Sequence, residues 1–532
     1  MKFISKAALT AAVLTSSTQA SALYINGKGH FTLRGESRKN PGFTGTASHQ
    51  AIDQFFRLDT EIRSGDKSSF VTELDIFENK RNSLLGDTAS PKNCSPTYVV
   101  PTNTDGSPIQ GDPNEASPAN TGNSSDCAGR QQSTLEPGYT EYQPIIRKAY
   151  ARYASELCLI TAGRRDREWG LGILYDSGKD IFDTTASIFD GITCDVNLQK
   201  AQTLGFSVGY DKISETGSLG TLGTTYGPRN QSDDLDQIFF SLIYRDSKGN
   251  SSNLSTEISI FFANIIGQGE LSTDVKIADL FMSFYMPELV IKQEILFRLG
   301  KTTDPNVSRI GGAVGDGAKN NLNSIAAAGY LEWILSKSGS LLGPEKYKRG
   351  SLSTHSLFLE YAYAPGDSDG YLNQFDATGN RARDNKATAI ALNQNYKPAL
   401  ILFNERLLDD NKRVDGIYDP FQVMNATILA TGYRFSGLED GTFTAKLINA
   451  SLNSAVNAKA KEKYLGFSSL PVGYNGRDLG WELDLSYSIE YERGLELGGT
   501  LAAAAPGKAL DTKNTGKPKE QLMIQSFMSF NF

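Results

Sequence analysis

Two stretches near the end of the chain alternate strictly between apolar and polar side chains. In the run 481–491 every second residue is apolar, and Glu482 and Asp484 stand between apolar neighbours; the run 521–532 alternates in the same way and ends on Phe532. In a β-strand, successive side chains point to opposite faces, so a period of two predicts strands whose two faces meet different environments. We expect the face with carboxylates to lie in water.

The same alternation recurs along the chain, in the runs 56–63, 70–77, 237–245, 254–262 and 291–299. Each run has eight or nine residues, close to the roughly nine to eleven that a tilted strand needs to cross a membrane. For any single run, the alternative is a strand of a soluble β-sandwich with its apolar side towards a core. The repetition favours an all-β fold, a transmembrane antiparallel β-barrel with lipid outside and a polar lumen inside.

The amino-terminal residues have the three parts of a secretory signal. Lys2 and Lys6 supply positive charge, a short apolar run follows, and Ala20-Ser21-Ala22 offers small residues for cleavage. The apolar run is too short to span a bilayer as a helix. We therefore predict a signal peptide at 1–22 and a single transmembrane barrel domain at 23–532, placed in a bacterial outer membrane.

The predicted connections alternate between short turns and long loops, the layout of outer-membrane barrels. The long connections are 81–144, 166–187, 212–234, 301–322, 365–420 and 453–478. Counting the runs gives about eighteen strands, with sixteen as the alternative, and an even count places both ends of the barrel in the periplasm. The long loops near 81–144 and 365–420 are expected to be extracellular. The last strand should pair with the first near Tyr24 and serve the barrel-insertion machinery as a signal.

The four cysteines allow three pairings. We favour Cys94–Cys127 within the first long loop and Cys158–Cys194 between consecutive strands, because each pair is local in this topology and export reaches an oxidising compartment. Free thiols in at least one pair are the alternative.

Composition excludes several classes of function. The formal net charge is −7, which argues against a nucleic-acid partner. The three histidines, His30, His49 and His355, are scattered, so no zinc site is predicted and no cofactor is expected. An outer-membrane enzyme would need a nucleophile beside a histidine, and no such motif occurs, so no catalytic residue is predicted.

The polar faces should line the lumen and carry both signs of charge. The predicted pore-lining residues are Arg57, Asp59, Glu61, Arg63, Glu73, Asp75, Lys148, Arg152, Arg164, Arg165, Arg167, Lys292, Glu294, Arg298, Glu482 and Asp484. Fixed charges in a pore select ions, and arginine suits carboxylates because its planar group donates two parallel hydrogen bonds. The alternative for each charge is a pair with a neighbouring strand and no role in solute binding. The stretch 164–167 stands at a strand end, where an inward-folded loop would begin.

Three stretches resemble the alginate-export family of outer-membrane porins: Leu159-Ile160-Thr161-Ala162-Gly163-Arg164-Arg165, Phe189-Asp190-Gly191-Ile192, and Gly480-Trp481-Glu482-Leu483-Asp484-Leu485. They occur in the family's order and span most of the chain after the signal. Arg165 stands where the family tends to have glutamine, and the cysteine-bearing loop 81–144 is not a family feature.

The resemblance implies a monomeric barrel of eighteen strands, with an arginine-lined passage for anionic polysaccharide or other small solutes. We therefore expect a channel for small hydrophilic solutes or oligosaccharides, anionic ones included, surrounded by outer-membrane lipids. A structural or adhesive barrel whose lumen is filled by loops is the alternative function.

Overall fold

The computed structural model describes most of the chain. The described residues are 23–40, 43, 48–78, 145–179, 186–197, 204–213, 235–246, 254–267, 272–302, 320–337, 354–367, 386–393, 395–403, 422–438, 441–455, 472–491, 494–511 and 518–532. The predicted signal peptide, the loop 81–144 and its two cysteines lie outside these residues, so those predictions stay predictions.

Strands dominate the described residues, and one short 3₁₀-helix, Lys508–Leu510, is present. The strands are β1 (Leu23–Lys39), β2 (Ser48–Ser64), β3 (Ser68–Glu78), β4 (Ile145–Ala154), β5 (Leu159–Asp166), β6 (Ile188–Asn197), β7 (Leu204–Ile213), β8 (Leu235–Asp246), β9 (Ser255–Gly267), β10 (Thr273–Tyr285), β11 (Leu289–Thr302), β12 (Asn320–Lys337), β13 (Thr354–Ala364), β14 (Lys386–Ala387), β15 (Ala426–Leu438), β16 (Gly441–Leu452), β17 (Asp478–Tyr491), β18 (Leu495–Pro506) and β19 (Gln521–Asn531).

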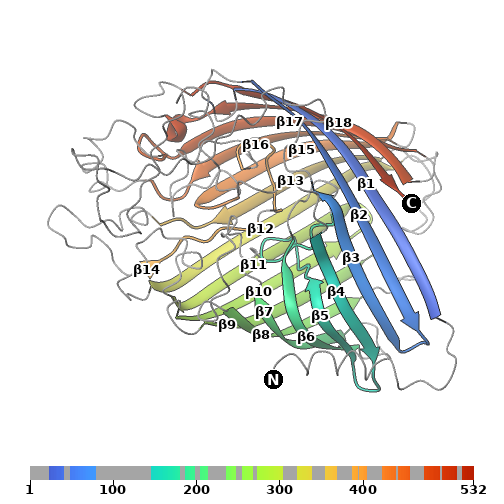
Figure 1. Cartoon of the computed structure of the whole chain (residues 1–532). Coiled ribbons are helices and arrows are strands. Elements are labelled where there is room, and N and C mark those ends of the chain that lie inside the picture. The colour runs from blue at the N-terminus through green and yellow to red at the C-terminus, as the bar shows by residue number, and fades with distance from the viewer. Residues whose placement is uncertain are drawn as a thin grey trace, which may run out of the picture.

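Within the described residues, eighteen of these strands pair with their neighbours in chain order and form a closed ring. Every pairing in the ring is antiparallel, and β1 closes it against β19. The two-residue β14 stands apart, because it belongs to a longer connection and pairs in parallel with Asn321 and Leu322 at the start of β12. The predicted fold class is confirmed, and of the two expected strand counts the described strands match eighteen. Figure 1 shows the strands running side by side around the barrel.

The closing pair of strands is staggered. Phe532 exchanges two backbone hydrogen bonds with Gly29, of 2.8 and 3.0 Å, and its ring covers that glycine so closely that a Cβ there would lie 2.2 Å from the ring. We expected the last strand to meet the first near Tyr24, and that register was wrong. Tilted strands in a barrel are offset from one another, so β1 begins before the end of β19 and its residues 23–28 pair with β2.

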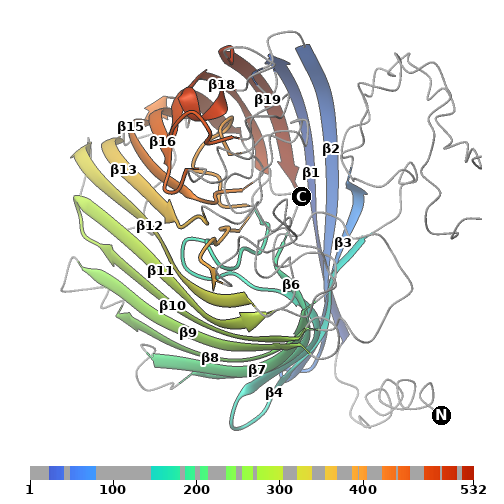
Figure 2. The ribbon, with the colours of Figure 1, turned by 90° about the vertical axis from the view of Figure 1, so that its left-hand side faces the viewer.

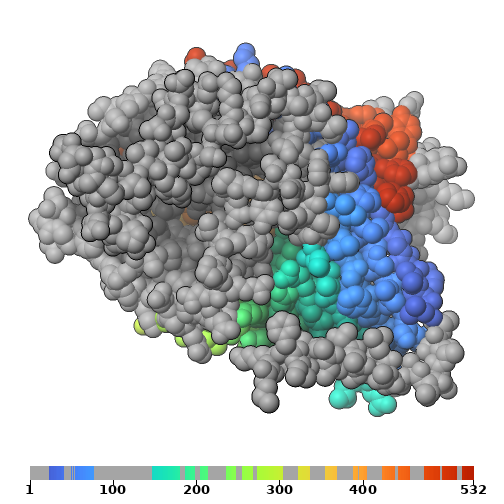
Figure 3. Space-filling view, in the orientation of Figure 1, coloured from blue at the N-terminus to red at the C-terminus, as the bar shows by residue number. Residues whose placement is uncertain are grey.

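The outward face of the ring is apolar, as the alternation predicts. On β17 the side chains of Trp481, Leu483 and Tyr491 are 52%, 43% and 50% exposed, whereas Glu482 between them is 1% exposed. Exposed leucine, isoleucine, phenylalanine and tyrosine residues recur on the other strands. Figure 3 shows the outer wall of β1 to β4 as a continuous surface. Such a wall is typical of a barrel that meets lipid on all sides.

No helix among the described residues has the length and apolar character required to span a membrane.

Most connections alternate in length around the ring; 338–353, at the short-turn end, and 268–272, at the other end, are exceptions. One end carries short turns, such as residues 65–67 between β2 and β3 and 286–288 between β10 and β11; the other carries longer connections, such as 167–187 and 365–425. Both Leu23 and Asn531 lie at the short-turn end, because β1 leaves it and β19 returns to it. Two of the long connections lie partly inside the ring (Figure 2).

One disulfide joins Cys158, in the turn before β5, to Cys194 on β6, with a Cα–Cα distance of 5.5 Å. The two strands are neighbours, and Cys194 lies opposite Ile160 in the register. This predicted pair is confirmed. It ties β5 to β6 at the short-turn end of the barrel.

Candidate functional site

The inner face of the ring holds most of the predicted pore-lining residues. The register places Arg57 opposite Asp75, Asp59 opposite Glu73, and Glu73 opposite Lys148, so these side chains share the inner face of β2, β3 and β4. The inner face also carries Glu61, Arg63, Arg152, Arg165, Lys292, Glu294, Arg298, Glu482 and Asp484. Arg167 follows β5 and also points inward.

Arg164 lies on the opposite side of the wall, which differs from our prediction. It forms a bidentate ion pair with Asp190 across β5 and β6, with nitrogen–oxygen distances of 3.0 and 2.9 Å. On the same outer face stand Ile192 and Tyr210, which are 50% and 45% exposed. Because neighbouring residues of a strand point to opposite faces, Arg164 and Arg165 cannot both line the lumen.

The connection between β5 and β6 turns into the barrel and binds the inner wall at β8, β10 and β11. Its Trp169 donates a hydrogen bond from Nε1 to Asp279 on β10 at 2.9 Å, and Tyr175 donates one to Gln237 on β8 at 2.6 Å. The backbone N–H of Leu171 donates to Glu294 on β11. We call residues 167–179 with 186–187 the first infolded segment.

Apolar contacts hold this segment against β6 to β9. The ring of Tyr175 meets those of Phe189 and Phe261 edge-on, with centroids 5.1 and 5.5 Å apart, and Trp169 lies 5.3 Å from Phe261. Burial raises the pKa of Tyr175, so this phenol stays protonated. Gly170, with a φ of +59°, permits the approach of Glu294, since a Cβ there would lie 2.5 Å from the carboxylate.

Two buried arginines share one buried carboxylate at the start of the segment. Arg165 and Arg167 each donate to a different oxygen of Asp211 on β7, at 2.6 Å in both cases, and the side chain of Asp211 is fully buried. The Arg167 guanidinium also lies 3.9 Å from the centroid of the Phe239 ring, within reach of a cation–π attraction. Both arginines therefore neutralise Asp211 and hold the start of the segment against β7.

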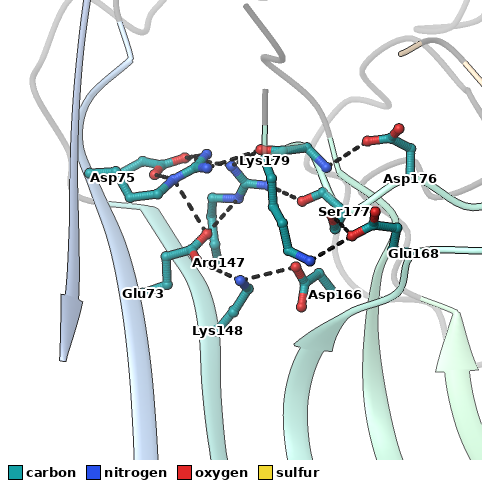
Figure 4. Close-up of polar contacts among 11 residues, drawn as sticks. Glu73, Asp75, Arg147, Lys148, Asp166, Glu168, Asp176, Ser177 and Lys179 are labelled. Carbon is teal, nitrogen blue, oxygen red and sulfur yellow. Dashed lines mark hydrogen bonds and ion pairs between the residues drawn. The ribbon is translucent and has the colours of Figure 1, made fainter. Parts of the chain in front are cut away.

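The far side of the segment reaches the charged wall of β2 to β4 (Figure 4). Arg57 donates to the carbonyl oxygen of Gly178 at 3.0 Å, and Arg147 donates to that of Ser177 at 2.8 Å. Both guanidinium groups also pair with Glu73 and Asp75. A network of cations and carboxylates therefore joins three wall strands to the infolded segment.

The same network continues along the segment. Lys148 bridges Glu73 and Asp166 at 2.6 and 3.0 Å, and Lys179 pairs with Glu168 at 2.5 Å. Burial disfavours the charged form of Glu168, but the hydrogen bond and charge of Lys179 outweigh it, and the net effect lowers the pKa of Glu168. Both members of that pair are more than half exposed, so they meet the aqueous lumen.

A second infolded segment, residues 386–393 with 395–403, lies against the opposite part of the wall. There the inner face of β13 to β18 carries small buried residues, which leave room for it: Ala362, Ala364, Ala426, Ala430, Ala450, Ala502 and Ala504. Ile401, Leu402 and Phe403 of the segment are at most 1% exposed. At its start, Arg298 of β11 donates to the carbonyl oxygen of Ala389.

One wall carboxylate holds this second segment by its backbone. Glu482 accepts hydrogen bonds from the N–H groups of Leu400 and Ile401 at 2.7 Å each, and from that of Leu402 at 2.9 Å. We expected the carboxylates on β17 to lie in water, and for Glu482 and Asp484 this was wrong. Backbone donors of the infolded segment stand where water would otherwise solvate Glu482.

The two infolded segments meet inside the barrel. The backbone N–H of Asn393 donates to the carbonyl of Ile173 at 2.9 Å, and its side chain donates to Ser187 at 3.0 Å. Asn395 donates to Asp176 at 3.0 Å. Together the segments form a partition across the lumen, built from chain regions about two hundred residues apart, as the separation of 219 between Asn395 and Asp176 shows.

Several of these residues escaped sequence reasoning. Lys148 was predicted to line the lumen, but its neighbour Arg147 was missed. Both reach Glu73, because a β-bulge interrupts the pairing of β3 with β4 between Glu73 and Leu74. Asn393 and Asn395 carried no signal, since they lie within a long connection. Asp211 could have been recognised, because the period of two places it on the inner face of β7 with Ser207 and Ile213, and a buried acid needs a basic partner.

Within the described residues, no group of three or more potential metal ligands occurs. The barrel and its partition define the class of molecule: a large transmembrane-type barrel whose lumen is narrowed from within.

No protein-family model matches the sequence, and no curated protein matches it. Solved structures with a similar arrangement include OccK8 (OprE) of Pseudomonas aeruginosa, with 13% identity and a TM-score of 0.46, covering 95% of this chain and 98% of that one. OpdQ of the same organism shows 11% identity and a TM-score of 0.46, covering 96% of this chain and 98% of that one.

Proposed function

We propose that the protein is an outer-membrane channel through which small hydrophilic solutes diffuse. The observation that carries this proposal is a closed barrel with an apolar outer wall, a charged inner wall and a lumen narrowed by two infolded segments. A wall with lipid on one side and fixed charges on the other separates two aqueous spaces, and an internal constriction limits the size of solutes that cross. The signal peptide and recognition of the last strand by insertion machinery belong to this proposal, as does a monomeric state.

The lumen charges support weak discrimination between ions. The described arginines Arg57, Arg147, Arg165 and Arg167 are paired with carboxylates, so their fields largely cancel. Arg63 and Arg152 are more exposed and lie towards the short-turn end, where a solute carboxylate or saccharide hydroxyl can reach them. A preference for anionic solutes or oligosaccharides would depend on such exposed groups.

Planar-bilayer recording tests the proposal. Protein refolded into its heat-modifiable, compact form should give discrete conductance steps, and liposomes containing it should swell in small sugars faster than in larger ones. A compact barrel that gives neither conductance nor swelling would refute the channel.

The second candidate is a structural or adhesive barrel, and one observation favours it: the two infolded segments contact each other across the lumen. The same recordings distinguish the two functions, because a sealed barrel would fold normally and stay silent. We propose no catalytic role. His30 contacts Asn531 and Thr32, and His355 contacts Tyr433, while the side chain of His49 lies outside the described part.

A further inference from the structure

The second infolded segment is bound to the wall through a side chain, that of Glu482, which takes no part in the pairing of the wall strands. Residues 400–402 present three consecutive backbone N–H groups to one carboxylate, and that carboxylate, Glu482, belongs to β17. Hydrogen bonds from backbone N–H to a carboxylate are stronger than those between neutral groups. The barrel register on either side of Glu482, with Ile448 and Ala504, is made by backbone groups and does not involve its side chain.

Glu294 is the wall carboxylate that binds the backbone of the first segment. It accepts the N–H of Leu171, lies against Gly170 and is fully buried on the inner face of β11. The first segment has many other anchors, including the aromatic contacts of Tyr175 and the two arginines that reach its far side. Two carboxylates of β17 anchor the 400–402 turn: Asp484 accepts a hydrogen bond from the backbone of Leu400, and Glu482 accepts from all three N–H groups.

We propose that Glu482 is the positioning residue of a latch: it fixes the second infolded segment against the wall and thereby sets the width of the constriction. This inference rests on the proposed channel function and goes further, since it names the residue that regulates the passage. Loss of the clamp removes the one acceptor that the three N–H groups share, so the 400–402 turn moves into the aqueous lumen, where water satisfies its N–H groups.

The first experiment compares unit conductance and sugar selectivity among variants. Glu482→Ala should raise unit conductance, or its fluctuation between levels, by about twofold or more, since the lumen cross-section governs passage. Glu482→Gln keeps one acceptor oxygen, so its unit conductance should lie between those of the wild type and Glu482→Ala. Glu332→Ala is the matched control, because its described partners Tyr330, Ser356 and Arg434 all lie on wall strands; its conductance should stay near that of the wild type.

A variant on the segment side protects the test against misfolding. Leu400→Pro removes one of the three donors and leaves every wall residue unchanged, and it should change conductance in the same direction as Glu482→Ala. Wild-type conductance and sugar cutoff in compact, heat-modifiable Glu482→Ala and Leu400→Pro proteins would overturn the latch.

A second readout does not depend on conductance. Ile401 is fully buried. A cysteine substituted for Ile401 should react slowly with a membrane-impermeant maleimide when Glu482 is present, and several-fold faster when Glu482→Ala is added. Equal rates in both backgrounds would refute the latch. A wild-type barrel that is silent in bilayers yet shows this difference would refute the channel function and leave the latch in place.

Discussion

At the scale of single residues, the face of the strand on which a charged side chain lies decides whether it is buried or exposed. Asp211 and Asp190 both pair with arginines of the same strand end, yet one faces the packed interior and the other the outer surface. The side chain of Asp211 is fully buried, whereas that of Asp190 is 45% exposed. Removing one partner of a buried ion pair is costly because the other charge stays without compensation.

We therefore expect Asp211→Asn to lower the free energy of unfolding by about 3–5 kcal/mol, since two buried arginines lose their shared counter-charge. Asp190→Asn is the matched control and should cost less than about 1 kcal/mol, as exposed pairs do. Urea titration of the refolded barrel, followed by its heat-modifiable mobility, measures both. Equal losses in the two variants would contradict the structural role given to Asp211.

The sequence predicts which face of a strand a residue occupies, but it does not predict which other segment covers that face. Alternation alone places Glu482 and Asp484 on the inner face, because strand geometry has a fixed period. It could not show that Glu482 is buried, since the donors come from residues 400–402, whose path inside the barrel depends on tertiary contacts. The period also separates Arg164 from Arg165, and applying it strictly there would have placed Arg164 outside.

At the scale of elements, the two infolded segments lie on differently built parts of the wall. The first rests on aromatic residues, and the second lies on a stretch of alanines, whose small side chains create its space. The alternation of apolar and polar residues predicts strands for both the aromatic and the alanine-rich inner faces. It does not tell whether an inner face is open to the lumen or covered by another segment. The difference in length between most short turns and long connections was predictable, whereas the inward course of the first infolded segment was anticipated only by the arginines at the end of β5.

The alanine wall gives a test at this scale. Ala502 on β18 is fully buried on the inner face, and its neighbour Ala503 is exposed on the outer face. Ala502→Leu should destabilise the fold by about 1–3 kcal/mol and alter conductance, because added methyl groups overfill a packed site. Ala503→Leu should be nearly neutral for both. Thermal unfolding and bilayer recording of the pair provide the comparison, and similar behaviour of the two variants would exclude a packed inner face at β18.

At the scale of the whole molecule, charges of both signs share the inner wall and mostly neutralise each other. We expect the wild-type channel to show a reversal potential near zero in a salt gradient, because opposed fixed charges cancel their fields. Arg152 is an exposed inner-face cation beside the ring of Tyr150, whose centroid lies 4.9 Å away. Arg152→Gln should shift selectivity towards cations.

Arg164→Gln is the control for that measurement, since this arginine lies on the outer face and should leave the reversal potential unchanged. A shift of equal size in both variants would mean that the effect of Arg152 does not arise in the lumen.

The staggered seam between β1 and β19 has a consequence for biosynthesis. It joins residues as far apart as His30 and Asn531, which are 501 positions apart in the sequence. The ring therefore cannot close until the final strand has been translated, and everything made earlier must be kept apart from other chains during export. A chain truncated before β19 would present two unpaired strand edges, on β1 and β18, which are templates for aggregation. Quality control of such a protein thus depends on its last few residues, because they alone convert an open sheet with two edges into a ring with none.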